Sequence, residues 1–162
     1  MASEDKRAED LINVMRQIPF PVTVVTASNG SSTRGITIGS FTSLSMEPPL
    51  ISFNVEKESQ MHEILQECDS FVVQIPHAAQ DELCTRFALP DQSDEEQFEG
   101  IAYRLSEKGV PILEDVVAVL ECSPYKWVDA GDHTLIIGEV EKVEILKNDP
   151  AILYLNGAYL NM

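Results

Sequence analysis

Residues 35–49 read GITIGSFTSLSMEPP, the most informative stretch of the sequence about the fold. Apolar side chains alternate there with small polar ones, a pattern that predicts a strand with one buried face. Pro48 and Pro49 end it. Glycine and hydroxyl side chains also let a flat ligand approach the backbone, whose N–H and C=O groups can read its polar edge. A strand crowded against another element explains the same composition, so both interpretations stay open.

Apolar, β-branched segments on both sides of this stretch predict further strands, and the runs between them predict only short helices. This alternation is too sparse for a doubly wound parallel sheet, and it favours a mainly β fold in which an antiparallel sheet is closed or curled into a barrel. Gly138 interrupts the last long strand, where a bulge is expected. The expected strands cover residues 22–27, 50–55, 71–75, 116–122 and 133–145. One expected helix begins after Ser59, and another covers residues 78–87.

Residues 4–17 predict an amphipathic helix, because Leu11, Ile12, Met15 and Ile18 recur at helical spacing. We expect residues 1–18 to pack on the barrel through this apolar face. The length of 162 residues fits one domain, which we expect to span 1–162.

The charge of the chain excludes two classes of partner. Eleven Lys and Arg stand against 27 Asp and Glu, a formal net charge of −16. Nucleic acids and anionic membrane surfaces are polyanions, so neither is expected to bind. No apolar run is long enough to cross a bilayer, and no secretory signal is visible at the N-terminus. Cys68, Cys84 and Cys122 are scattered, as reduced thiols in a cytoplasmic protein would be, and no metal-ligand spacing is present.

Two other positions could carry chemistry. The predicted helix start at Ser59 and Gln60 offers free N–H groups to a phosphate, although a plain N-cap explains it equally. His133 follows Gly131 and Asp132 at a strand start, where a histidine is often only structural. Dinucleotide-fold glycines, a P-loop and a nucleophile elbow are all missing from the sequence.

Taken in order, these segments resemble the flavin reductase-like family, whose fold is a split β-barrel that binds FMN or FAD. The resemblance runs from about Pro19 to Tyr159, most of the chain. The most specific patterns are SFTSLSMEPP at 40–49 and GDHTLIIGEV at 131–140. The supporting ones are VTVVT at 22–26, KESQMH at 57–62, RFA at 86–88, GVPIL at 109–113, LEC at 120–122 and LYLNGAY at 153–159.

The resemblance implies a homodimer with flavin near the subunit interface, and it implies roles for individual residues. His133 would lie by the nicotinamide and the flavin ring as the catalytic residue, with an orienting or proton-handling role. Glu58 departs from the family pattern and puts a negative charge beside the expected phosphate. The cofactor-binding residues implied are Thr37, Gly39, Ser40, Phe41, Thr42 and Ser43 along the flavin, Lys57, Ser59 and Gln60 at its phosphate, Phe87 beside it, and Tyr154 and Tyr159 on the pyridine-nucleotide side.

Three functions follow from these observations. The first is an NAD(P)H:flavin oxidoreductase, whose relatives in many cases supply reduced flavin to a separate monooxygenase. The second is a flavin-binding electron carrier or storage protein without NAD(P)H activity. The third is a barrel that binds a protein partner through its acidic face. The choices between FMN and FAD and between NADH and NADPH stay open, although the scarcity of cations favours NADH.

Overall fold

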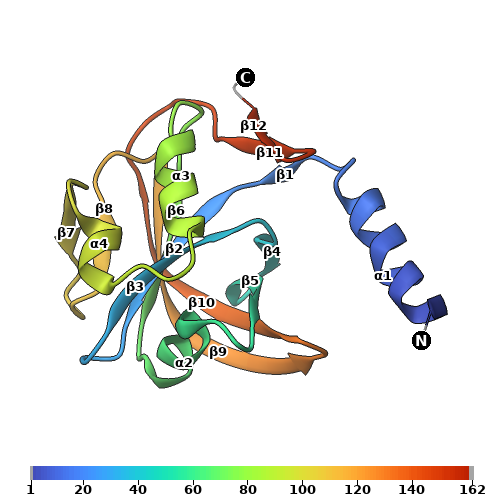
Figure 1. Cartoon of the computed structure of the whole chain (residues 1–162). Helices are drawn as coiled ribbons and strands as arrows, with labels where there is room; N and C mark the ends of the chain where they lie inside the picture. Colours follow the sequence, from blue (N-terminus) through green and yellow to red (C-terminus); the bar gives the residue numbers. More distant parts are fainter. Residues whose placement is uncertain (1, 161–162) are drawn as a thin grey trace.

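A seven-stranded antiparallel sheet forms the centre of the molecule (Figure 1). The computed structural model describes residues 2–160. The order of the strands across the sheet is β3-β2-β6-β9-β10-β5-β4. Their bounds are β2 (Thr23–Ser28), β3 (Thr33–Ile38), β4 (Thr42–Met46), β5 (Pro49–Glu56), β6 (Phe71–Ile75), β9 (Ala118–Ala130) and β10 (His133–Ile145).

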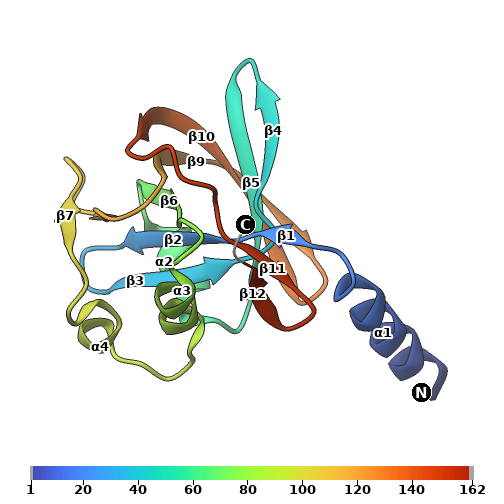
Figure 2. The same ribbon diagram turned by 90° about the horizontal axis from the view of Figure 1, so that it is seen from above.

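The sheet curls strongly because its two edges are joined by a short connection. β3 and β4 are the edge strands, yet only residues 39–41 link them. Such a link spans at most roughly 14 Å, whereas the edges of seven flat strands would lie about 29 Å apart. The edges must therefore approach each other, as Figures 1 and 2 show. The expectation that residues 35–45 form one continuous strand is wrong, because the chain leaves the side of β2 at Ile38 and joins β5 from Thr42.

Three of the helices and two small sheets surround this curled sheet. The N-terminal helix is α1 (Ala2–Met15). The other helices are α2 (Gln60–Glu67), α3 (Asp81–Ala88) and α4 (Asp94–Phe98). β1 (Phe20–Pro21), β11 (Leu153–Leu155) and β12 (Ala158–Leu160) form a three-stranded sheet, and β7 (Tyr103–Leu105) pairs with β8 (Pro111–Leu113).

Both faces of the sheet are buried in its middle. One apolar cluster contains Phe53 and Phe71 from the sheet and Leu65 from α2. A second contains Phe87 from α3 and Ile112 from β8. Neighbouring residues of β2 alternate between the two clusters, which explains why this strand reads as an unbroken β-branched run.

One smaller expectation is confirmed, and the C-terminal segment adds a further contact. The register between β9 and β10 shifts between Ile137 and Gly138, the expected bulge, where a side chain at 138 would collide with the ring of Phe71. The C-terminal segment packs, since Ile152 is fully buried and accepts a hydrogen bond from the Val22 N–H at 3.4 Å. Among the helices of residues 2–160, none is long and apolar enough to cross a membrane.

α1 forms as expected but does not pack on the sheet of its own chain. It extends away from the rest of the molecule in both views (Figures 1 and 2). Its apolar side chains are largely exposed, with Leu11 at 61% and Ile12 at 52%. The amphipathic pattern is sufficient to predict the helix, but within the described residues its apolar face stays largely exposed.

Candidate functional site

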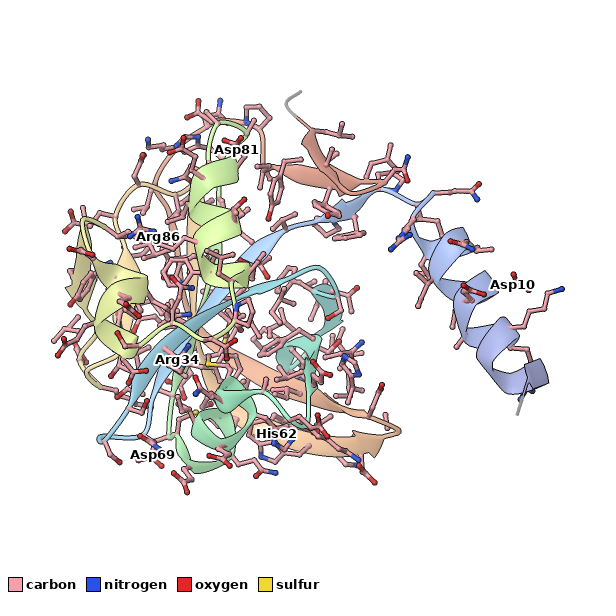
Figure 3. All side chains as sticks on the ribbon, viewed as in Figure 1. Asp10, Arg34, His62, Asp69, Asp81 and Arg86 are labelled. Atoms are coloured by element: carbon pink, nitrogen blue, oxygen red, sulfur yellow. The ribbon has the colours of Figure 1, made fainter. Side chains whose placement is uncertain are left out.

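A cleft of about 560 Å³ lies between β3, the start of α2 and the end of α3 with the loop that follows it. We call it the β3 cleft. Its volume falls within the roughly 300–1,000 Å³ of sites for drug-sized ligands. Arg34, labelled in Figure 3, lies at this junction of elements. The lining residues are Arg34, Gly35, Ile36, Glu56, Glu58, Ser59, Gln60, Met61, Phe87, Ala88, Leu89, Pro90, Asp91 and Gln97.

The first turn of α2 faces the cleft. Ser59 is its N-cap, because the His62 N–H donates to the Ser59 Oγ at 3.2 Å. The Ser59 hydroxyl itself donates to the Glu56 carbonyl at 2.8 Å, which fixes the cap. The N–H groups that open a helix have no acceptor within it and suit an anion. The structure therefore brings Ser59 and Gln60 to the cleft together.

Lys57 is not brought to the cleft. Its ammonium group forms an ion pair with Asp129 and donates to the Gly131 carbonyl at 2.7 Å. These partners belong to the end of β9 and the turn before β10, so the side chain is directed away from the residues that line the cleft. The sequence pattern could not reveal Asp129 as a competing partner.

The charges around the cleft do not favour an anion. Arg34 is its single basic lining residue, and the Arg34 Nη1 lies 2.8 Å from the Asp94 carboxylate. Burial acts to raise the pKa of Asp94, but hydrogen bonds from Ser32, Thr33 and Arg34 outweigh it and lower that pKa. Because Glu56, Glu58 and Asp91 also line the cleft, a phosphate there would depend mainly on backbone N–H groups.

The residues expected along the flavin divide into two groups. Thr37 and Gly39 serve internal packing: the Thr37 hydroxyl donates to the Cys84 carbonyl at 2.6 Å, and a side chain at 39 would collide with the Phe20 ring. Phe41 is half-buried against the core. The second group, Ser40, Thr42 and Ser43, is exposed at the connection between β3 and β4 and on β4 itself. The Ser40 Oγ accepts a hydrogen bond from the Asn54 N–H at 2.9 Å.

Phe87 lines the β3 cleft, but its ring belongs mainly to the core. It is 2% exposed and contacts the Phe98 ring edge-to-face at 5.4 Å. Gly35 has no side chain where the Phe87 ring approaches β3, and an added Cβ would lie 2.5 Å from that ring. Phe87 can therefore form part of a wall but presents little surface to a ligand.

Tyr154 and Tyr159 lie outside the β3 cleft, in an aromatic cluster with Phe20. The Tyr154 ring lies 5.2 Å from that of Phe20 and 5.0 Å from that of Tyr159. Burial is the main cause of the raised pKa of Tyr159. This cluster adjoins Gly39, so it borders the connection between β3 and β4.

His133 also lies outside the β3 cleft, at the start of β10. Its Nδ1 lies 2.7 Å from the Asp132 carboxylate, and this hydrogen bond is the main cause of the lowered pKa of Asp132. In the sheet His133 stands opposite Glu56, a residue that does line the cleft. The histidine side chain is 44% exposed, so it is accessible to a second molecule.

The cysteines offer no nucleophile. Cys68, Cys84 and Cys122 are free and buried. Burial raises the pKa of Cys84 to about 12 and that of Cys122 to about 12, so both remain neutral thiols at physiological pH. In the described part of the chain, no group of three or more His, Cys, Asp or Glu could hold a metal ion.

Sequence reasoning missed the contribution of α4 to this region. Residues 91–99 contain five acidic residues and no basic one, a composition that predicts a solvated loop or helix. Gln97 is nevertheless 2% exposed and lines the cleft. A signal was present, because Ser93 and Glu96 have the spacing of a capping box, and the structure contains both of its hydrogen bonds. The pattern predicts where α4 begins but not that β3 would be its partner.

Comparison with known proteins gives consistent matches over most of the chain. An FMN reductase (NADH) from Agrobacterium fabrum is 34% identical over 91% of this chain and 82% of its own. The solved NADH:FAD oxidoreductase SgcE6 from Streptomyces globisporus, in complex with NAD and FAD fragments, has a TM-score of 0.89 and 34% identity, and the match covers 97% of this chain and 93% of that one.

A second solved structure is BorF, the flavin reductase component of a bacterial two-component tryptophan halogenase. It has a TM-score of 0.88 and 30% identity, and the match covers 96% of this chain and 98% of that one. The flavin reductase like domain matches residues 15–162. The resemblance inferred from the sequence is thereby confirmed, and the chain belongs to the flavin reductase like domain family.

Proposed function

We propose that this protein is an NAD(P)H:flavin oxidoreductase that transfers a hydride from NAD(P)H to FMN or FAD. The observation that carries the proposal is the similarity, over 97% of this chain, to an NADH:FAD oxidoreductase solved with NAD and FAD fragments. The bound flavin would supply the hydride-accepting chemistry. The protein would hold the two ring systems at reacting distance and exclude water, which needs no nucleophilic side chain.

The β3 cleft fits one end of a flavin nucleotide by its volume and by its donors. The first N–H groups of α2 are available to a phosphate, with Ser59 and Gln60 at its edge. The backbone and hydroxyls of Ser40, Thr42 and Ser43 would lie along the flavin, with Thr37, Gly39 and Phe41 shaping the strand behind them. Phe87 would close the wall, and Lys57 would act only after release from Asp129.

His133 is proposed to orient the nicotinamide and the flavin ring or to handle a proton. Its exposed side chain and its position opposite Glu56 support access to both the nicotinamide and the flavin ring. Tyr154 and Tyr159 would shape the pyridine-nucleotide side through the aromatic cluster that borders Gly39. Replacing His133 with Ala should lower turnover by about tenfold or more while flavin affinity changes less. An unchanged kcat would return His133 to a structural role.

The short link between β3 and β4 supports a split β-barrel, and the family match over residues 15–162 supports one domain for 1–162. A homodimer is supported by exposed apolar side chains on α1 and β4, where Leu44 is 50% and Met46 is 79% exposed. The three free, buried cysteines support a cytoplasmic location. A monooxygenase or halogenase that uses the reduced flavin is a further proposed partner, by similarity to BorF.

A purified sample tests the activity directly. With catalytic amounts of protein and added FMN or FAD, we expect rapid oxidation of NADH in air, followed at the nicotinamide absorbance. Comparing FMN with FAD and NADH with NADPH would settle both choices. If the protein binds flavin but does not oxidise NADH or NADPH, the proposed enzyme activity is contradicted and an electron carrier or storage protein is indicated. If it binds no flavin, a barrel that binds a protein partner is indicated.

A further inference from the structure

The outer edge of β3 is closed by side chains of α4 in place of another strand. The Gly35 N–H donates to the Gln97 Oε1 at 3.0 Å, and the Gln97 Nε2 donates to the Gly35 carbonyl at 3.1 Å. A neighbouring strand would satisfy the same two backbone groups. Gln97 thus fastens α4 to the edge strand that lines the β3 cleft.

Asp94 and Arg34 form a second set of contacts between α4 and β3, one helical turn before Gln97. The Asp94 carboxylate accepts from the Thr33 N–H at 3.1 Å and from the Arg34 Nη1 at 2.8 Å. The same Nη1 donates to the Gln92 carbonyl at 2.9 Å. One nitrogen of a side chain that is only 9% exposed therefore joins β3 both to α4 and to the loop before it.

The loop held by Arg34 is the wall of the cleft that faces α2. Leu89, Pro90 and Asp91 lie in this loop and line the cleft. The Gln92 Nε2 donates to the Arg86 carbonyl at 2.7 Å and to the Leu89 carbonyl at 3.0 Å, so the loop is also tied to the last turn of α3. Arg34 therefore contacts, at the Gln92 carbonyl, the loop that forms this wall.

We propose that Arg34 is a positioning residue for flavin, which sets the width of the β3 cleft by holding residues 89–92 in place. The inference rests on the proposed function. Asp94 neutralises the guanidinium, so Arg34 acts through geometry and not as a free counter-charge for the phosphate. A wall that is already ordered lowers the entropic cost of binding the ligand.

Arg34→Gln tests the proposal in the full-length protein, with flavin fluorescence giving Kd for FMN and for riboflavin, which lacks the phosphate. We expect both Kd values to rise about tenfold, with kcat at saturating flavin little changed. In Arg34→Lys we expect both Kd values to stay close to those of the wild type. The reason is that a single nitrogen of Arg34, Nη1, donates both to Asp94 and to the Gln92 carbonyl. Glu95→Gln removes an exposed carboxylate of the same helix and should change neither. Hydrogen exchange of residues 88–93 should accelerate in Arg34→Gln only.

Several results would overturn the proposal. An increase in Kd confined to FMN would mean that Arg34 contacts the phosphate directly, and unchanged Kd values would mean that the wall is fixed without it. If Arg34→Gln does not fold, Gln92→Ala removes the side-chain bonds from the loop to α3 but keeps the Gln92 carbonyl that Arg34 holds. Both Kd values should then stay near those of the wild type, and a tenfold rise would mean that the Gln92 side chain, and not Arg34, fixes the wall. If the wild-type protein binds no flavin, the proposed function fails, while hydrogen exchange still shows whether Arg34 holds the loop.

Discussion

α1 and α2 are both amphipathic helices, yet only α2 has its apolar face covered. α2 buries Met61, Ile64 and Leu65 against the curled sheet. α1 leaves Leu11 and its apolar neighbours exposed. The difference shows that periodicity predicts a helix and its apolar face, whereas the partner of that face depends on where the chain places the helix. For α2 the partner is the sheet of the same chain, and for α1 we propose a second subunit.

The largest expected effect separates the two helices by stability. Leu65→Ala should lower the free energy of unfolding by about 2–5 kcal/mol, because the side chain is fully buried. Leu11→Ala should change it by no more than about 0.5 kcal/mol in the monomer. Chemical denaturation at low protein concentration measures both, and equal losses would show that α1 is also packed within its own chain.

The next effect concerns assembly. If α1 is covered by a second subunit, Leu11→Asp should convert the proposed dimer to monomer, because a carboxylate would be buried without a partner. Asn13→Asp adds the same charge on a different side of the helix and is the matched control. Sedimentation velocity distinguishes the two species. A wild-type protein that sediments as a monomer would contradict the proposed homodimer.

At the start of α2, Ser59→Ala should cost about 0.5–2 kcal/mol through loss of the N-cap, measured by denaturation. Ser59→Asp keeps a good cap but places a negative charge at the first turn. We therefore expect Ser59→Asp to retain stability, to bind riboflavin normally and to bind FMN more weakly. Equal binding of FMN by the wild type and Ser59→Asp would place the phosphate elsewhere.

The smallest effect is a pH dependence at α4. Because the pKa of Asp94 is lowered in the folded state, its contribution is complete at neutral pH and is lost as pH falls below the ordinary carboxyl value of about 3.9. Asp94→Asn should therefore be less stable than the wild type near neutrality and closer to it in acid. Denaturation at a series of pH values measures this, with Glu95→Gln as control, and parallel curves would mean that Asp94 contributes nothing specific.

The candidate site was only partly predictable. Ser59 and Gln60 reached the β3 cleft because an N-cap and the free amides beside it are local features, encoded within a few residues. Lys57 did not, because its ion pair with Asp129 depends on the distant end of β9. Arg34 and Gln97 escaped the prediction for the same reason, since their partners lie about 60 positions away in sequence.

The sequence was sufficient for the class of fold, five strands of the central sheet, three of the helices, the bulge at Gly138 and the family. Each of these depends on local periodicity, turn chemistry or a motif of a few residues. Only the three-dimensional structure shows that residues 35–45 contribute to two edge strands of one curled sheet, that α4 closes the edge of β3, and that the apolar face of α1 is left largely exposed. These features depend on contacts between distant segments, which local patterns do not specify.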